Sequence, residues 1–190
     1  MNNIKYLKIL NLFWYQNFCF FMDVTEIINI INKLRENPNE YKKIINLSEI
    51  EDLYKENINE ISLLITKQQK QNGFKIKEEL NKIAKDYIYQ ILKNKDNDRD
   101  NIDLEEIAER YGIFEGYLIK YIDDESFDSK SFINKLLFDI IKEDKFRQKN
   151  LIIFDKNIKL IGIANLKKDD FNISVILFCS NFINYNELNN

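Results

Sequence analysis

The chain has 190 residues, of which 45% are hydrophobic and 13% aromatic, which is enough for one domain with its own core. Its net charge of −3 excludes a general basic field that would attract nucleic acid or an anionic membrane. The chain has no histidine, so it lacks the commonest general base at neutral pH and the commonest ligand of transition metals.

Two further features of the composition bear on compartment and source. Cys19 and Cys179 are too few for a disulfide framework, which favours a reducing compartment. Asn, Ile and Lys are very frequent, with one Pro and four Gly, as is typical of AT-rich genomes such as those of some single-celled eukaryotes. With so many asparagines, the two glycosylation sequons at Asn46 and Asn172 are expected from chance alone.

Residues 1–22 form an aromatic-rich segment that resembles a signal peptide only in part. Asn11, Gln16 and Asn17 interrupt its apolar run, and no small-x-small cleavage site follows, so it is not a convincing membrane span either. Three interpretations stay open: a docking or core-packing segment, a signal or anchor, and translation from Met22. The candidate docking residues are Phe13, Trp14, Phe18, Phe20 and Phe21.

Helix signals dominate the next part of the chain. A capping box at Asp23 and Glu26 precedes the apolar spacing of residues 24–35. Asn37 and Pro38 are typical of the start of a further helix. A third helix is expected after Ser48, ending before Gly73.

Residues 76–92 show the clearest helical spacing of the chain. Asp103 is expected to cap a short helix that Gly112 closes, and 116–122 is a short strand candidate. Asp128 or Ser129 is expected to cap a helix over 129–144. Two late stretches, 158–166 and 172–182, are apolar on both faces, which predicts strands of a sheet covered on both sides.

These elements predict an α+β fold, a three-layer αβα sandwich with a small, mainly antiparallel sheet between helices. The expected organisation is a segment over 1–22, a single domain over 23–183 and a polar tail over 184–190.

Several stretches, taken in order, resemble the CAP superfamily, the SCP-like domains related to pathogenesis-related and cysteine-rich secretory proteins. The opening INKLRENPNEYKKI is similar to the family's Asn-x-x-Arg-x-x-x-Pro-x-x-Tyr, and EELNKIAKDYIYQ resembles its next signature helix. YGIFEGYLIKYI resembles its entry to a strand, FINKLLFDIIKEDKFRQKNLI its later helix, and KLIGIA and VILFCSNF its final strands. The positions treated as structural motif are Asn32, Arg35, Pro38, Tyr41, Arg147, Asn150 and Gly162.

The resemblance implies a surface cleft in which two histidines and acidic residues bind a divalent metal such as zinc. Here Tyr87 stands at the first histidine, Lys120 at the strand glutamate and Phe146 at the second histidine. A phenol is a poor zinc ligand at neutral pH, an ammonium repels a cation and a phenyl ring has no lone pair. We therefore expect no metal and no cofactor.

Chemistry by other residues is not expected. Ser and Thr have no histidine to activate them, and Cys179 in a strand is expected to be a small core residue. The acid pairs Asp123–Asp124 and Asp169–Asp170 are expected to be solvated rather than catalytic. Arg147 is expected to donate to backbone carbonyls where helix meets strand, with an anion cleft formed by Arg147 and Lys120 as the alternative.

The functional hypothesis is a catalytically inactive CAP-like domain that acts as a binding or structural module. Its partners would be other proteins of a larger assembly inside the cell, for example a cytoskeletal or ciliary one, with neither nucleic acid nor membrane as partner. The alternative is a secreted CAP-like protein that binds a lipid or another small apolar ligand.

Overall fold

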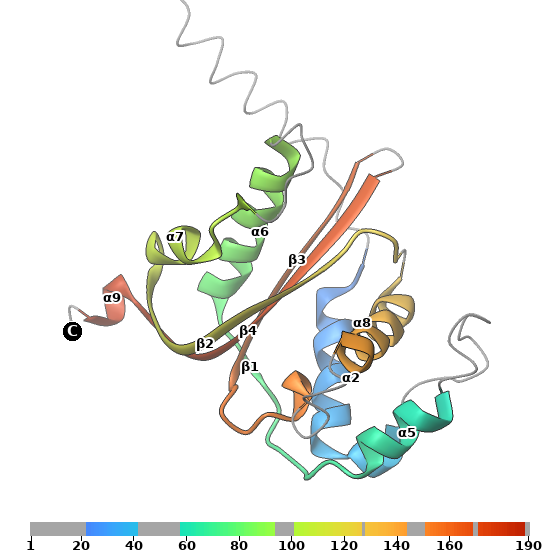
Figure 1. The fold of residues 1–190 in the computed structure, drawn as a ribbon. Coiled ribbons are helices and arrows are strands. Elements are labelled where there is room, and N and C mark those ends of the chain that lie inside the picture. The colour runs from blue at the N-terminus through green and yellow to red at the C-terminus, as the bar shows by residue number, and fades with distance from the viewer. Residues whose placement is uncertain are drawn as a thin grey trace, which may run out of the picture.

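The structure is a computed structural model that describes residues 22–41, 58–93, 101–126, 128–143, 151–168 and 171–188. Helices and strands alternate irregularly along these ranges (Figure 1). The helices are α2 (Val24–Glu36), η1 (Pro38–Glu40), α5 (Ile58–Thr66), α6 (Glu78–Lys93), α7 (Leu104–Glu109), α8 (Ser129–Glu143), η4 (Ile152–Phe154) and α9 (Tyr185–Leu188). The strands are β1 (Lys75–Ile76), β2 (Gly112–Asp123), β3 (Leu160–Lys168) and β4 (Phe171–Asn184).

A four-stranded sheet with the order β1-β3-β4-β2 forms the middle of the molecule. β4 pairs antiparallel with both β3 and β2, and the very short β1 pairs parallel with β3. The prediction of a small, mainly antiparallel sheet is confirmed, and the two late apolar stretches are neighbouring strands of that sheet, as predicted.

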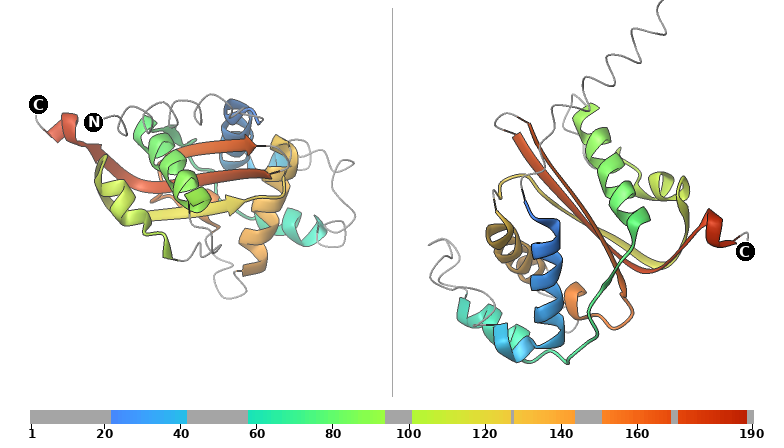
Figure 2. Two further views of the ribbon diagram at one scale, coloured as in Figure 1. Left: turned by 90° about the horizontal axis from the view of Figure 1, so that it is seen from above. Right: turned by 180° about the vertical axis from the view of Figure 1, so that it is seen from behind.

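Helices cover both faces of the sheet, which confirms the three-layer α+β fold. α6 and α7 lie on one face, and α2, α5 and α8 lie on the other (Figures 1 and 2). Successive residues of β4 divide between the two cores: Ile176 and Phe178 join the α2 side, while Val175 and Leu177 join the α6 side. This alternation explains why the strand sequences are apolar throughout.

The helix α7 departs from its predicted end. Asp103 caps its first turn, accepting hydrogen bonds from the amides of Glu105 (2.9 Å) and Glu106 (3.1 Å), as predicted. The helix, however, ends at Glu109, and Gly112 is the first residue of β2. A Cβ on Gly112 would lie 2.3 Å from the carbonyl oxygen of Ile183, so this glycine serves strand pairing and not helix closure.

One of the predicted solvated carboxylates is buried. Asp123 is 2% exposed, accepts a hydrogen bond from the amide of Ser126 (3.0 Å) and forms an ion pair with Lys135 of α8 (2.8 Å). The expectation for Asp123 was wrong because the sequence does not show that α8 brings an ammonium group back to the end of β2. Burial alone would lower the pKa of Lys135, but the hydrogen bonds to Asp123 and Glu125 raise it above its ordinary value. Asp169 and Asp170 lie outside the described residues.

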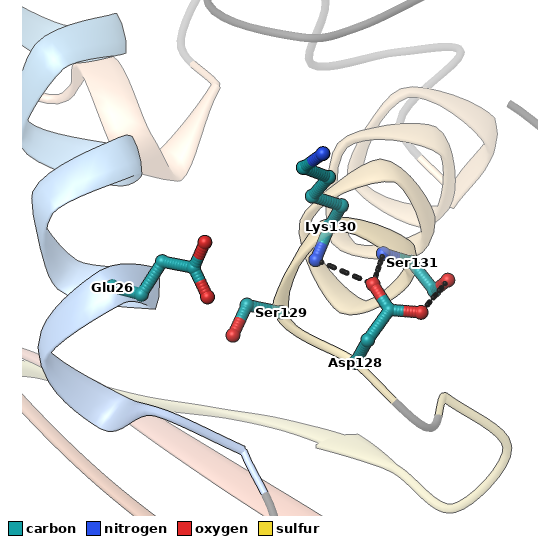
Figure 3. Close-up of a pocket in the computed structure, with 5 residues that line it drawn as sticks. All are labelled: Glu26, Asp128, Ser129, Lys130 and Ser131. Carbon is teal, nitrogen blue, oxygen red and sulfur yellow. Dashed lines mark hydrogen bonds between the residues drawn. The ribbon is translucent and has the colours of Figure 1, made fainter. Parts of the chain in front are cut away.

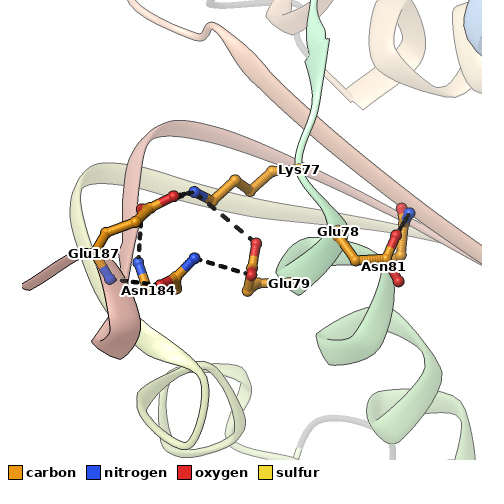
Figure 4. A network of polar contacts seen from close by, with 6 residues as sticks. All are labelled: Lys77, Glu78, Glu79, Asn81, Asn184 and Glu187. Carbon is orange, nitrogen blue, oxygen red and sulfur yellow. Dashed lines mark hydrogen bonds and ion pairs between the residues drawn. The ribbon is translucent and has the colours of Figure 1, made fainter.

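The chain end, predicted only as a polar tail, folds into α9 and is joined by polar contacts to the start of α6 and the end of α7. Lys77 forms an ion pair with Glu187 at 2.7 Å, and the amide group of Asn184 donates to Glu79 at 3.0 Å (Figure 4). The hydroxyl of Tyr185 donates to the carbonyl of Glu109 at the end of α7. These contacts hold the end of β4 against the start of α6.

Asp128 is the N-cap of α8, one of the two residues predicted for that role. Its Oδ1 accepts from the amides of Lys130 and Ser131 at 2.9 Å, and its Oδ2 accepts from the hydroxyl of Ser131 at 2.7 Å (Figure 3). Although burial opposes the shift, the hydrogen bonds from Ser131 and Lys130 and the charge of Lys130 lower the pKa of Asp128 below its ordinary value.

We expect Asp128→Ala to lower the free energy of unfolding by about 1 kcal/mol at pH 7, because two amides lose their acceptor. A carboxylate whose pKa is lowered on folding stabilises the fold at any pH above the pKa that it has in the unfolded chain. This stabilisation is lost as pH falls through the pKa of the folded state. Urea unfolding of the two proteins should therefore differ at pH 7, and the difference should begin to shrink as pH falls below about 4. An unchanged difference down to pH 2.5 would contradict the ionic origin of this cap.

Candidate functional site

The structure brings together two of the three positions that the resemblance assigns to a metal site. Tyr87 lies on the buried face of α6, Lys120 lies on β2, and the ammonium of Lys120 donates a hydrogen bond to the Tyr87 hydroxyl at 2.6 Å. The same nitrogen lies 4.7 Å from the centre of the Tyr87 ring, close enough for a cation–π contact. Phe146, the third position, lies outside the described residues, as do Arg147 and Asn150.

The Tyr87–Lys120 pair is sheltered on one side and open on the other. Tyr87 has no exposed surface, so its ring belongs to the core between α6 and the sheet. Lys120 is half-buried and reaches an open hollow of about 580 Å³. The hollow is lined by Asn101, Ile102, Asp103, Leu104, Glu105, Leu118 and Lys120.

The chemistry that this hollow offers is limited. Among the described residues that line it, the charged ones are Asp103, Glu105 and Lys120, and the Asp103 carboxylate is already occupied as the cap of α7. Within the described ranges, no three Asp, Glu, Cys or His side chains gather closely enough to hold a metal ion. The described part of the hollow thus presents one half-buried ammonium, that of Lys120, beside polar groups of the α7 start.

A second hollow lies between the starts of α2 and α8. It has a volume of about 430 Å³ and is lined by Glu26, Asp128, Ser129, Lys130 and Ser131 (Figure 3). The Asp128 carboxylate faces the first turn of its own helix, and the Ser129 side chain lies toward Glu26 (Figure 3). The Asp128 carboxylate here is already engaged as the cap of α8.

Arg35, named from the sequence as a structural position, has the kind of role that was expected for Arg147, and the Arg147 expectation itself stays untested. The side chain is 2% exposed and lies at the end of α2. Its guanidinium donates to the carbonyls of Asn72, Ile153, Asp155 and Ile158 and stacks 4.0 Å from the Phe74 ring centre. Burial lowers the pKa of Arg35 to about 10, opposed by the charge of Asp155, so the group keeps its charge at neutral pH.

Asn32, one helical turn earlier, holds the same loop. Its Nδ2 donates to the Phe74 carbonyl at 3.2 Å, and its Oδ1 accepts from the Phe74 amide at 2.7 Å. Pro38 and Tyr41 are buried directly after α2, and burial raises the pKa of Tyr41 to about 12. The part of the opening motif that the structure describes is therefore a structural clamp and not a ligand site.

Gly162, a further structural position named from the sequence, lies where α6 approaches β3 closely. A Cβ at this residue would lie 2.3 Å from Leu80 Cβ and 2.5 Å from the Leu80 carbonyl carbon. Next to it, the Asn81 side chain accepts a hydrogen bond from the Ile163 amide at 2.9 Å. No sequence pattern indicated that α6 would bond directly to the backbone of β3.

Two further sequence expectations are tested by burial. Cys179 is fully buried in β4, as predicted, and burial raises the pKa of its thiol to about 11, which makes it a poor nucleophile. Asn172 of the second sequon is 3% exposed and donates to the Ser126 carbonyl, so a glycan cannot attach to it in the folded protein. Asn46 and the candidate docking residues Phe13, Trp14, Phe18, Phe20 and Phe21 lie outside the described residues.

Comparison with known proteins gives little on function. No protein-family model matches the chain, and a search of curated proteins finds no match. Among solved structures, an outer surface protein of Borrelia burgdorferi is similar, with 19% identity and a TM-score of 0.44, over 67% of this chain and 88% of that one. In the part of the chain that the structure describes, none of the helices has the length and apolar character needed to span a membrane.

Proposed function

We propose that this chain is a catalytically inactive CAP-like domain that serves as a binding or structural module in a larger protein assembly. The observation that carries the proposal is the 2.6 Å hydrogen bond between Lys120 and Tyr87. The resemblance predicts these two positions to be metal ligands, and they lie side by side although 33 residues separate them. A CAP-like cleft requires that the helix position of Tyr87 and the strand position of Lys120 lie next to each other, as they do here.

The replacement of these two ligands explains why a module is favoured over an enzyme. The Tyr87 hydroxyl accepts a hydrogen bond from the Lys120 ammonium, which engages a lone pair of its oxygen, and the positive charge of Lys120 repels a metal cation. The fold around the pair is well packed: Tyr87 lies in the core, and on the other face of the sheet Asn32 and Arg35 of α2 bond to the backbone of Phe74 and Ile158. A domain that has this fold but lacks the metal ligands is suited to binding other proteins through its surface, in an assembly of cytoskeletal or ciliary type inside the cell.

Calorimetric titration of the purified chain with zinc at pH 7 should show no stoichiometric tight site. The matched variant Tyr87→His, Lys120→Glu restores two family ligands and is expected to bind zinc more tightly than the unmodified chain, because both positions then offer lone pairs. Tight zinc binding by the unmodified chain that disappears in Tyr87→Phe, Lys120→Ala would contradict the inactive site.

The assembly part of the proposal has a separate test. Native size-exclusion chromatography of the protein from its own cells should place it well above the 22.9 kDa of the single chain. Purified alone, the same chain should elute near its own mass. Elution of the cellular protein as a free 22.9 kDa chain would overturn its role as a component of an assembly.

A further inference from the structure

The connection between α5 and β1 contains Asn72–Gly73, the only asparagine of the sequence that is followed directly by glycine. This pair is chemically the most prone to lose a side-chain amide, because glycine has no Cβ to shield its nitrogen and leaves the backbone free to turn. Neither residue belongs to a helix or a strand, and Asn72 is exposed. The pair therefore has the sequence and the exposure of a site of covalent modification.

The two groups that would react are not held by hydrogen bonds of their own. They are the side-chain amide of Asn72 and the backbone nitrogen of Gly73, and neither of them donates to any of the residues that the structure describes. The electrophile and the nucleophile are both available. Whether they meet depends on the backbone that carries them.

The end of α2 holds this backbone on both sides of the pair (Figure 1). The carbonyl of Asn72 accepts from Nε of Arg35, and the amide of Gln71 donates to the Arg35 carbonyl at 3.0 Å. Directly after the pair, Asn32 accepts from the Phe74 amide at 2.7 Å and donates to the Phe74 carbonyl at 3.2 Å. Four hydrogen bonds to α2 thus flank the two reacting groups.

Loss of the amide requires the backbone to turn. The Gly73 nitrogen must close a nearly flat five-membered imide ring with the side chain of Asn72, and this ring sets the ψ angle of Asn72 outside the regions that ordinary residues adopt. The rotation turns the Asn72 carbonyl away from Arg35. Room beside Gly73 is also limited, since a Cβ there would lie 2.7 Å from a carboxylate oxygen of Glu36.

We propose that Asn72–Gly73 is a deamidation site that the hydrogen bonds of Arg35 and Asn32 keep unreactive, and that it reacts when this loop leaves α2. The Gly73 nitrogen forms a bond to the side-chain carbonyl carbon of Asn72. The bond from that carbon to the amide nitrogen breaks, and ammonia leaves with the proton of the Gly73 nitrogen. Water then opens the imide at either carbonyl and gives aspartate or isoaspartate.

The products would prevent the loop from returning to the same contacts. In isoaspartate the backbone runs through the former side-chain carbon, which lengthens the loop by a CH2 group and turns the carbonyl that accepts from Arg35 into a free carboxylate. Both products add a negative charge beside Arg35. The reaction would thus mark chains in which the loop has opened, and this inference does not depend on the proposed function.

Prolonged incubation at pH 7, followed by digestion and mass spectrometry, measures the conversion of Asn72 in the full chain. A synthetic peptide of residues 69–76 is the reference without the hydrogen bonds to α2. The folded chain should react at least about tenfold more slowly than the peptide. Asn32→Ala removes both bonds to Phe74 and should accelerate the reaction of the folded chain by about tenfold.

Asp128→Ala is the matched control, because it removes hydrogen bonds beside the start of α2, whereas the loop lies at the end of that helix. It should leave the rate at Asn72 unchanged. If Asn32→Ala does not fold by circular dichroism, Arg35→Lys replaces it, since lysine lacks the Nε donor. Equal rates in the peptide and the folded chain, no acceleration by the α2 variant, or the same acceleration in Asp128→Ala would overturn the proposal.

Discussion

Replacing Arg35 by alanine is expected to lower the free energy of unfolding by about 3–5 kcal/mol. The guanidinium donates to four backbone carbonyls, those of Asn72, Ile153, Asp155 and Ile158. Alanine would leave these acceptors buried without a donor and would also remove the stacking on Phe74 at 4.0 Å. The two hydrogen bonds between Asn32 and Phe74 would remain, but residues 153–158 would lose the hydrogen bonds that join them to Arg35 of α2.

Urea unfolding at pH 7 measures this effect, with two control variants. Arg35→Lys keeps the charge but not the planar fork, so we expect it to recover only part of the loss. Arg110→Ala removes an exposed arginine that forms an ion pair with Glu106, four residues earlier, and should change the unfolding free energy by less than about 0.5 kcal/mol. A loss below about 1 kcal/mol for Arg35→Ala would show that the carbonyls find other donors.

The role of Arg35 shows where the sequence analysis was incomplete. A buried guanidinium fork was expected, but it was assigned to Arg147, which lies outside the described residues. A signal for Arg35 was present, because it follows Ile31 by four residues and so lies on the buried face of α2 with Leu34. An arginine on an apolar helical face indicates that the end of its side chain meets buried polar groups.

Periodicity was enough to predict the layers of the fold. The stripe along α6 and the two-sided apolar character of β3 and β4 depend on neighbouring residues only, and each was found as predicted. Contacts between residues far apart in the chain could not be predicted in this way. The pair of Asp123 with Lys135 and the bond of Asn165 to Met22 depend on how the layers come together in space.

The candidate site shows the same division. Neither the helical spacing around Tyr87 nor the strand around Lys120 indicates that the two side chains meet, and only the family resemblance placed them in one cleft. The structure brings them within hydrogen-bond distance. The polar lining of the neighbouring hollow, in contrast, comes mainly from the start of α7, where the sequence had indicated only a helix cap.

The second large effect is expected for Gly162→Ala, which should lower the free energy of unfolding by about 2–3 kcal/mol or more. The added Cβ would lie 2.3 Å from Leu80 Cβ, 2.5 Å from the Leu80 carbonyl carbon and 2.7 Å from the Asn81 nitrogen. Two of these atoms belong to the backbone of α6, so no side-chain rotation can relieve the clash. The helix must move away from β3, which stretches the 2.9 Å bond between Asn81 and the Ile163 amide and opens the core beneath Leu80.

Gly73→Ala is the matched control for this substitution, since both replace a glycine in a crowded place by the same residue. At Gly73 the nearest atom to an added Cβ is the carboxylate oxygen of Glu36 at 2.7 Å, followed by Asn32 Cγ at 3.0 Å. The end of the Glu36 side chain can rotate away, so we expect a loss of about 1 kcal/mol or less. Urea unfolding of the two variants should therefore rank Gly162→Ala well below Gly73→Ala in stability. The reverse order would mean that α6 can move freely over β3, and the close approach at Gly162 would then not be what positions Tyr87 against Lys120.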